Sequence, residues 1–288
     1  MDTSDLLRRV RRIEIKTRAL TNNIFAGEYH SAFKGRGMSF AEVREYQAGD
    51  DVRDIDWNVT ARMNRPYVKV FEEERELTMM LLVDLSASQN FGTCERTQRE
   101  LATEIAATLA FSAMQNNDKI GVIFFTDRIE KFIPPKKGRK HILYIIRELL
   151  NFEPVGKRTK VGEAVEFLMR VQSKRCITFV LSDFIDAGNF EQPLVVAARK
   201  HDLVALRLTD PRMEQMPDVG LLRITDAETG YTGYIDTSSS ALKHCQHIWN
   251  EQTEKARKEL FRKHGVDYIS ISTKGDYVRP LINLFAHR

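Results

Sequence analysis

Three oxygen-bearing side chains follow one apolar segment at alternate positions in MMLLVDLSASQNFGT, residues 79–93. Asp84 comes at the end of the apolar run, and Ser86 and Ser88 follow it. A carboxylate and two hydroxyls are hard oxygen donors, which suit Mg²⁺, Mn²⁺ or Ca²⁺ rather than zinc. Small hydroxylated residues also cap helices and satisfy loop amides, so this stretch alone is compatible with an ordinary strand end.

Two further oxygen donors come from distant parts of the chain. Asp183 ends a second apolar segment, ITFVLSDF, and Thr159 lies in the loop GKRTKVGEAV just before an expected helix. If the strands ending at Asp84 and Asp183 are neighbours where the strand order of a parallel sheet reverses, these groups meet at the top of the sheet. A divalent cation, with Mg²⁺ expected and Mn²⁺ or Ca²⁺ as alternatives, would keep a position free for a partner's Glu or Asp. The predicted metal ligands are Asp84, Ser86, Ser88, Thr159 and Asp183. The alternative is that loop N–H groups hold the two carboxylates without a metal.

The elements that must position these residues follow an alternating pattern. Apolar runs at 79–83, 120–125, 176–181 and 203–208 are separated by helical patterns at 98–114, 140–150, 161–171 and 190–200. Nearly continuous apolar strands are typical of a sheet covered by helices on both faces. We therefore expect an α/β fold with a doubly wound, mainly parallel, Rossmann-type sheet. Residues 221–237 predict a hairpin, 238–265 a long helix and 266–273 a last strand.

The first 76 residues differ in composition from residues 77–288, which we expect to form the α/β domain. Leu6, Val10 and Ile13 recur near helical spacing among arginines, which predicts an amphipathic N-terminal helix. A highly charged module follows, in which Ser39 and Glu42 have capping-box spacing and could start a short helix. Four aspartates in this module lie among arginines and match no EF-hand loop, so paired charges are favoured over a metal site. These aspartates are Asp50, Asp51, Asp54 and Asp56.

The composition of the 288-residue chain excludes several classes of protein. Hydrophobic residues make up 42% and charged residues 29%, which fits a globular protein, and a net charge of +4 is too weak to indicate nucleic acid binding. The basic run at 134–140 is expected to be a solvated loop. No apolar run reaches the roughly 18–20 residues of a membrane span, and the N-terminus lacks an apolar signal-peptide core. We therefore predict a cytoplasmic protein. Three widely separated cysteines predict neither a disulfide framework nor a zinc site.

Catalysis is not expected from these residues. A phosphatase with a nucleophilic aspartate would need a second carboxylate at position 86, where the chain has Ser86. A serine hydrolase would need glycines around its nucleophile, which the DLSAS stretch lacks, and no phosphate-binding glycine loop is present. The alternative to a non-enzymatic protein is a hydrolase that acts on a phosphate or acyl ester through the loop at Asp84 and Ser86.

The five predicted ligands, in their order along the chain, resemble the metal-ion-dependent adhesion site (MIDAS) of the von Willebrand factor A domain. That family has Asp-x-Ser-x-Ser, then a distant Thr and a distant Asp. The resemblance implies that Ser86, Ser88 and Thr159 are direct or near-direct ligands, with Asp84 and Asp183 acting partly through water. It also implies a domain that binds other proteins.

The charged module adds a second resemblance, to the bacterial family called domain of unknown function 58. The matching positions are 35–37, Glu42, Arg44, Tyr46, 49–50, Arg53, 55–57 and 61–62. Members of that family are commonly encoded beside AAA+ ATPases of the MoxR type. The resemblance implies an adaptor or co-chaperone that binds such an ATPase or its client, and not an enzyme.

Overall fold

The computed structural model describes residues 38–73, 77–94, 96–186 and 188–288. The N-terminal helix predicted around Leu6 to Ile13 lies outside these residues. The chain divides into two compact units, with Phe33–Leu77 in one and Thr78–Arg288 in the other. Each unit is described by itself below.

The larger unit is built on a six-stranded sheet with the order β10-β7-β6-β3-β4-β5. Its strands are β3 (Thr78–Asp84), β4 (Lys119–Phe125), β5 (Ile129–Lys136), β6 (Ile177–Ser182), β7 (Asp202–Thr209) and β10 (Asp267–Ser272). All neighbours pair in parallel except β4 and β5. Renumbered along the chain, this is the doubly wound order 3-2-1-4-5-6, which reverses between β3 and β6. The predicted α/β, doubly wound and mainly parallel sheet is confirmed.

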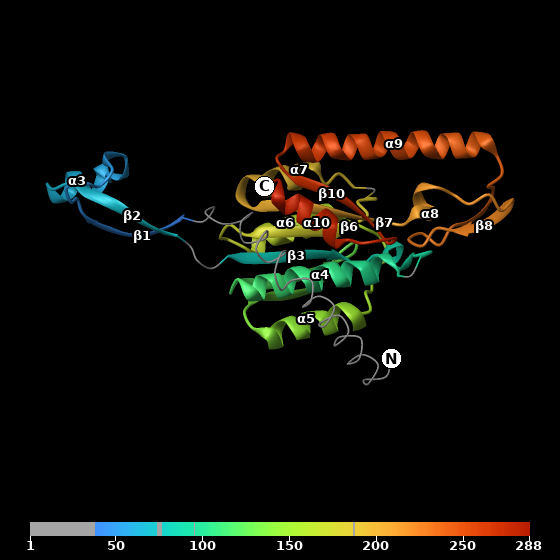
Figure 1. Cartoon of the computed structure of the whole chain (residues 1–288), viewed down its shortest axis with the longest axis horizontal. Helices are drawn as coiled ribbons and strands as arrows, with labels where there is room; N and C mark the ends of the chain where they lie inside the picture. Colours follow the sequence, from blue (N-terminus) through green and yellow to red (C-terminus); the bar gives the residue numbers. More distant parts are fainter. Residues whose placement is uncertain (1–37, 74–76, 95, 187) are drawn as a thin grey trace. The chain divides into compact units, whose positions relative to one another are not determined.

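Helices cover both faces of the sheet, which explains why β3, β4 and β6 are apolar along almost their whole length. One layer contains α4 (Gln98–Gln115), α5 (Arg139–Asn151) and α10 (Val278–Ala286); the other contains α6 (Val161–Val171), α7 (Glu191–Lys200) and α9 (Ser240–Lys263). Figure 1 shows α4 and α5 on one side of β3, with α7 and α9 on the opposite side. Met80 and Leu82 share a buried core with residues of α6, α7 and α9. Tyr277, just before α10, contacts Thr108 of α4 through their hydroxyls.

Several elements of the larger unit were not expected from the sequence, among them β5, α10 and the short helix α8 (Pro211–Glu214). Strand β5 runs antiparallel at the edge of the sheet and includes Pro134 and Pro135, which a strand tolerates at an edge. The expected solvated loop at 134–140 is therefore wrong for residues up to Lys136. Helix α10 near the C-terminus is another unexpected element. The predicted hairpin is confirmed as β8 (Leu221–Thr225) paired with β9 (Thr232–Asp236), and it follows the short helix α8 (Pro211–Glu214).

The smaller unit is a β-hairpin with short helices between its strands. Strand β1 (Met38–Glu45) pairs antiparallel with β2 (Tyr67–Glu73), and the 3₁₀ helix η2 (Val52–Asp54) and helix α3 (Trp57–Met63) lie between them in sequence. The helix proposed to start at Ser39 is therefore wrong, because this segment pairs with β2 as a strand.

The aspartates of the smaller unit serve structural roles. Arg44 donates two hydrogen bonds of 2.7 and 2.8 Å to Asp50. Asp51 pairs with Arg53 at 2.9 Å, and Asp56 caps α3 by accepting from the amides of Asn58 and Val59. These contacts confirm paired charges and caps for three of the four aspartates.

Candidate metal site

Asp84 and Asp183 lie at the carboxyl ends of two adjacent parallel strands. Val83 of β3 pairs with Leu181 of β6, so both strands end at the same edge of the sheet, where the strand order reverses. Both aspartates are buried, with exposed fractions of 0% and 1%. The sequence therefore places two carboxylates at the position where doubly wound sheets bind ligands.

Hydroxyl groups link the two carboxylates. Ser88 Oγ donates to Asp183 Oδ2 at 2.8 Å and lies 3.0 Å from Ser86 Oγ, while the Ser86 amide donates to Asp84 Oδ1 at 2.9 Å. On the other side, Ser182 Oγ donates to Asp84 Oδ2 at 2.6 Å. Four of the five predicted ligands thus belong to one hydrogen-bonded network. Ser182 is a fifth member that the sequence analysis did not single out, although it directly precedes Asp183.

Thr159 comes from a loop that is attached to the Asp84 loop. The Ala87 amide donates to the Lys157 carbonyl at 2.9 Å, and the Lys160 amide donates to the Thr126 carbonyl at 3.1 Å. The loop packs so closely that a Cβ at Gly156 would lie 2.1 Å from Thr126 Oγ1. Only glycine fits there, and this packing fixes the loop beside the end of the sheet.

Thr159 makes a contact that the sequence did not indicate. Its side chain is buried, and its Oγ1 donates to Glu228 Oε1 at 2.9 Å. Glu228 lies in the turn between β8 and β9, 69 residues away along the chain. The structure thus places a third carboxylate against Thr159, and no hydrogen bond described for Thr159 joins it to the other four predicted ligands.

The electrostatics of the site are unfavourable for two free carboxylates. Burial, and after it the charge of Asp183, raise the pKa of Asp84 to about 7. Burial also raises the pKa of Asp183, opposed by hydrogen bonds from the Ile185 amide and Ser88 and by the charge of Arg257. The hydrogen bonds described for these two carboxylates come from amides and hydroxyls, which are neutral. A cation at this place would relieve the repulsion.

The donor set fits a hard divalent cation. The carboxylates of Asp84 and Asp183 and the hydroxyls of Ser86, Ser88 and Thr159 are the oxygen ligands that Mg²⁺ or Mn²⁺ accept. Across the described ranges, no group of three or more His, Cys, Asp or Glu side chains is arranged to hold a metal ion. A cation at this site would therefore be bound by two carboxylates together with hydroxyl groups.

Asp210 shows how a buried aspartate is accommodated without a cation. It follows β7 at the same edge and accepts hydrogen bonds from Thr93 Oγ1 at 2.5 Å, Thr273 Oγ1 at 2.6 Å, and the amides of Thr93 and Arg212. Burial acts to raise its pKa, but hydrogen bonds from Thr273 and Thr93 outweigh burial and keep the pKa below its usual value. Asp210 is thus a structural residue.

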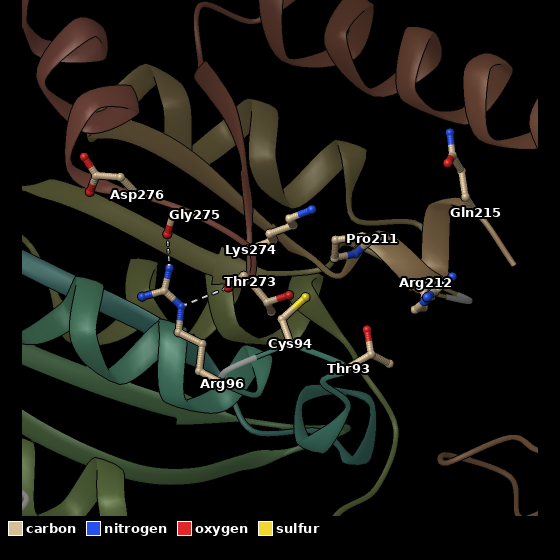
Figure 2. Close-up of a pocket in the computed structure, with 10 residues that line it drawn as sticks. All are labelled: Thr93, Cys94, Arg96, Pro211, Arg212, Gln215, Thr273, Lys274, Gly275 and Asp276. Atoms are coloured by element: carbon tan, nitrogen blue, oxygen red, sulfur yellow. Dashed lines mark hydrogen bonds between the residues drawn. The ribbon is translucent and has the colours of Figure 1, made fainter. Parts of the chain in front are cut away.

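An open cavity of about 960 Å³ adjoins this region, and Figure 2 shows its lining. None of the five predicted ligands lines it. Arg96, on its wall, donates to the Thr273 carbonyl at 3.1 Å and the Gly275 carbonyl at 2.6 Å, and pairs with Glu104 at 2.8 Å. Arg96 thus connects the loop before α4 to the loop after β10. This part of the cavity wall has a structural role and is separate from the carboxylate site.

The doubly wound sheet and the two buried aspartates at its reversal point agree with the von Willebrand factor A-like fold expected from the sequence. The chain belongs to the family described as "Protein of unknown function DUF58", whose model matches residues 42–257. The protein described as "Uncharacterized protein Rv1480", from Mycobacterium tuberculosis, is 29% identical over 298 residues, covering 100% of this chain and 91% of that protein. Both recognised resemblances, to the A-type fold and to this family, are confirmed.

Two solved structures share the fold at low sequence identity. The conserved hypothetical protein BatB from Bacteroides thetaiotaomicron matches 73% of this chain and 98% of its own, with a TM-score of 0.50 and 15% identity. An aerotolerance-related membrane protein from Bacteroides fragilis matches 74% of this chain and 100% of its own, with a TM-score of 0.51 and 14% identity. These likenesses show the fold alone.

The prediction of a cytoplasmic location is wrong as a conclusion from the sequence. A solved structure with this fold is described as that of a membrane protein, so the features used to place the chain in the cytoplasm do not assign a location. Among the described helices, none is both long and apolar enough to cross a bilayer.

Proposed function

We propose that this chain is a non-enzymatic protein-interaction module with a divalent cation, Mg²⁺ by preference, at the reversal point of its sheet. The ligands are Asp84, Ser86, Ser88, Thr159 and Asp183, and a carboxylate from a partner protein completes the coordination. The observation that carries the proposal is the buried pair of carboxylates Asp84 and Asp183 at the ends of adjacent strands. The pKa of each is raised, and the hydroxyls that donate to them are neutral.

The chain's own residues orient the ligands. Ser182 Oγ and the Ser86 amide each hold one oxygen of Asp84, and the Ile185 amide holds one oxygen of Asp183. Such outer hydrogen bonds fix the ligands in place before the ion binds. The cation, when bound, supplies a positive charge that can accept an acidic side chain from outside.

For the partner, we propose a MoxR-type AAA+ ATPase or its client, with this chain as adaptor or co-chaperone. The support for this step is family membership together with the matching charged module, in which Arg44 pairs with Asp50. Hydrolysis has less support. Ser86 Oγ contacts Ser88 Oγ, and the contacts described for His141, His201 and His264 lie elsewhere.

The test is a binding assay between the purified chain and the MoxR-type ATPase of the same organism, with Mg²⁺ or with EDTA. We expect a complex with Mg²⁺ that is lost with EDTA and in the Asp84→Ala variant. Asp218→Ala is the control, because Asp218 is an exposed aspartate whose partner is Lys243. A complex that persists in EDTA and in Asp84→Ala would overturn the metal-bridged mechanism.

A further inference from the structure

The open cavity of about 960 Å³ is formed by three segments that are far apart in the sequence. Cys94 comes from the loop before α4, Arg212 from helix α8 after β7, and Lys274 from the loop after β10. Figure 2 shows Cys94 and Lys274 on one side of the cavity, with Pro211 and Arg212 across from them. A group from a second molecule can therefore contact all three segments at once.

Asp210 connects these three segments to one another. Its carboxylate accepts from Thr93 Oγ1 at 2.5 Å, from Thr273 Oγ1 at 2.6 Å and from the Arg212 amide at 2.9 Å. All three donor residues line the cavity, whereas Asp210 is buried and does not line it. One buried carboxylate thus fixes the shape of the cavity in advance, which lowers the cost of ordering it around a ligand.

The charge of the cavity favours an anion. Among the lining residues that the structure describes, Arg96, Arg212 and Lys274 are cationic and only Asp276 is acidic. Arg96 is already paired with Glu104. The side chains of Arg212 and Lys274 are exposed, and no ion pair or side-chain hydrogen bond is described for either within the described part of the chain. These two cations are therefore available to a ligand.

The other lining groups favour a peptide over a small organic molecule or a nucleic acid. Pockets for organic ligands are lined mainly by apolar and aromatic side chains, and nucleic acid bases stack on aromatic rings. No aromatic side chain is among the described residues that line this cavity, and the others there are mostly small or polar. Carboxylates suit its cations, because an arginine can bind a carboxylate through two parallel hydrogen bonds.

We propose that this cavity binds an acidic segment of a partner protein, with Arg212 and Lys274 pairing with its carboxylates. The proposal goes beyond the metal site, because it requires no cation. The two places lie at one edge of the sheet, since β6 and β7 are neighbouring parallel strands and Asp183 and Asp210 directly follow them. A partner that gives one carboxylate to the metal can therefore place others in this cavity.

The test measures binding of fluorescein-labelled hexaglutamate to the full chain by fluorescence anisotropy, at low salt and in EDTA. The variant is Arg212→Gln with Lys274→Gln. The control is Lys258→Gln with Lys263→Gln, which removes the same charge from exposed positions on α9. We expect the cavity variant to bind the peptide about tenfold more weakly than the wild type, and the control variant to bind it nearly as tightly.

The cysteines give a second, local measurement. Cys94 and Cys245 are both exposed, but only Cys94 lines the cavity. Hexaglutamate should slow the alkylation of Cys94 by iodoacetamide and leave the rate at Cys245 unchanged, as followed by mass spectrometry of the two peptides. The cavity variant should lose this protection.

Four results would overturn the proposal: absence of hexaglutamate binding, equal weakening in the two double variants, equal protection of Cys94 by inorganic phosphate, and tighter cavity-dependent binding of a single-stranded oligonucleotide. Phosphate protection would indicate a site for small anions, and oligonucleotide binding a nucleic acid surface. Because the assay contains EDTA, its failure leaves the Mg²⁺-dependent complex of the proposed function standing. Loss of that complex would equally leave this cavity as a peptide site.

Discussion

Asp84 and Asp183 are linked by two serine hydroxyls: Ser182, the last residue of β6, donates to Asp84 at 2.6 Å, and Ser88, in the loop after β3, donates to Asp183 at 2.8 Å. Each carboxylate thus accepts a hydrogen bond from a serine of the segment that carries the other. These two hydrogen bonds hold two like charges close together at the edge of the sheet. The arrangement costs stability in the free protein, and that cost makes the site testable.

Replacing Asp84 by Asn should stabilise the metal-free protein. The folded chain holds Asp84 with a pKa of about 7 against 3.8 for the ordinary group, so stability is lost as pH rises through this interval and stays low above it. At pH 8 the change removes a few kcal/mol of unfavourable charge burial at most, and ~1 kcal/mol shifts Tm by about 2–4 °C. We expect a higher Tm in EDTA and no further rise with Mg²⁺, measured by thermal unfolding.

The control for this prediction is the same change at Asp210, another buried aspartate. Its four hydrogen bonds keep its pKa low, so Asp210→Asn loses favourable interactions and should lower Tm with or without Mg²⁺. A higher Tm for Asp84→Asn together with a lower Tm for Asp210→Asn would support an unfavourable buried negative charge at Asp84. Destabilisation by both substitutions would contradict it.

Replacing Thr159 by Val should weaken metal binding while leaving the fold intact. Valine keeps the shape of the side chain but lacks the hydroxyl that is expected to bind the cation and that donates to Glu228. We expect Mn²⁺ affinity to fall about tenfold or more, measured by titration with Mn²⁺. Thr103→Val is a matched control, because Thr103 is also buried and bonds only the Arg99 carbonyl among its described contacts. Equal affinity in both variants would remove Thr159 from the ligand set.

Apolar continuity along the chain is enough to predict the central strands and, through them, the positions of Asp84 and Asp183. A strand buried on both faces is apolar at nearly every position, and Asp84 and Asp183 come where the apolar runs of β3 and β6 end. Strand β5 lacks this signal, because it pairs on one side only and contains two prolines and three lysines or glutamates in IEKFIPPK. The β1–β2 hairpin was not predicted for the same reason, because its strands carry many charged residues.

Glu228 had no sequence signal at all. Its hydrogen bond to Thr159 spans 69 residues, and the turn DAETG has the sequence of an ordinary hairpin turn. Such long-range contacts follow from how the loops pack after the sheet has formed. Ser182 differs, because a hydroxyl directly before Asp183 at a strand end could have been counted among the oxygen donors.

The stability of the protein should depend on pH through His201. This side chain is 1% exposed, and its Nδ1 accepts from the Cys176 amide at 3.3 Å. Burial, then the charges of Lys200 and Arg175, lower the pKa of His201 from 6.5 to about 4. Between these values the unfolded chain binds the extra proton, so stability falls as pH drops below about 6.5.

Between pH 7 and pH 5 the His201 contribution amounts to about 2 kcal/mol. His201→Asn keeps an acceptor for the Cys176 amide and removes the titration, so its urea unfolding free energy should fall less over this range than that of the wild type. His247→Asn, at an exposed histidine on α9, should behave as the wild type. Equal slopes for all three proteins would contradict this prediction, because they would mean that His201 binds a proton as readily in the folded chain as in the unfolded chain.

Arg288 should stabilise the opposite edge of the sheet without influencing the metal site. Its guanidinium, 5% exposed, donates to Asp202 at 2.5 Å and to Asp267, which are the first residues of β7 and β10. Arg288→Met leaves Asp202 buried without this partner, and removing one member of a buried ion pair costs about 3 kcal/mol. We expect that loss in urea unfolding, a smaller loss in Arg288→Lys, and unchanged Mn²⁺ affinity in both, because the metal ligands follow the carboxyl ends of the strands. A fall in Mn²⁺ affinity with Arg288→Met would show that the two edges of the sheet are coupled.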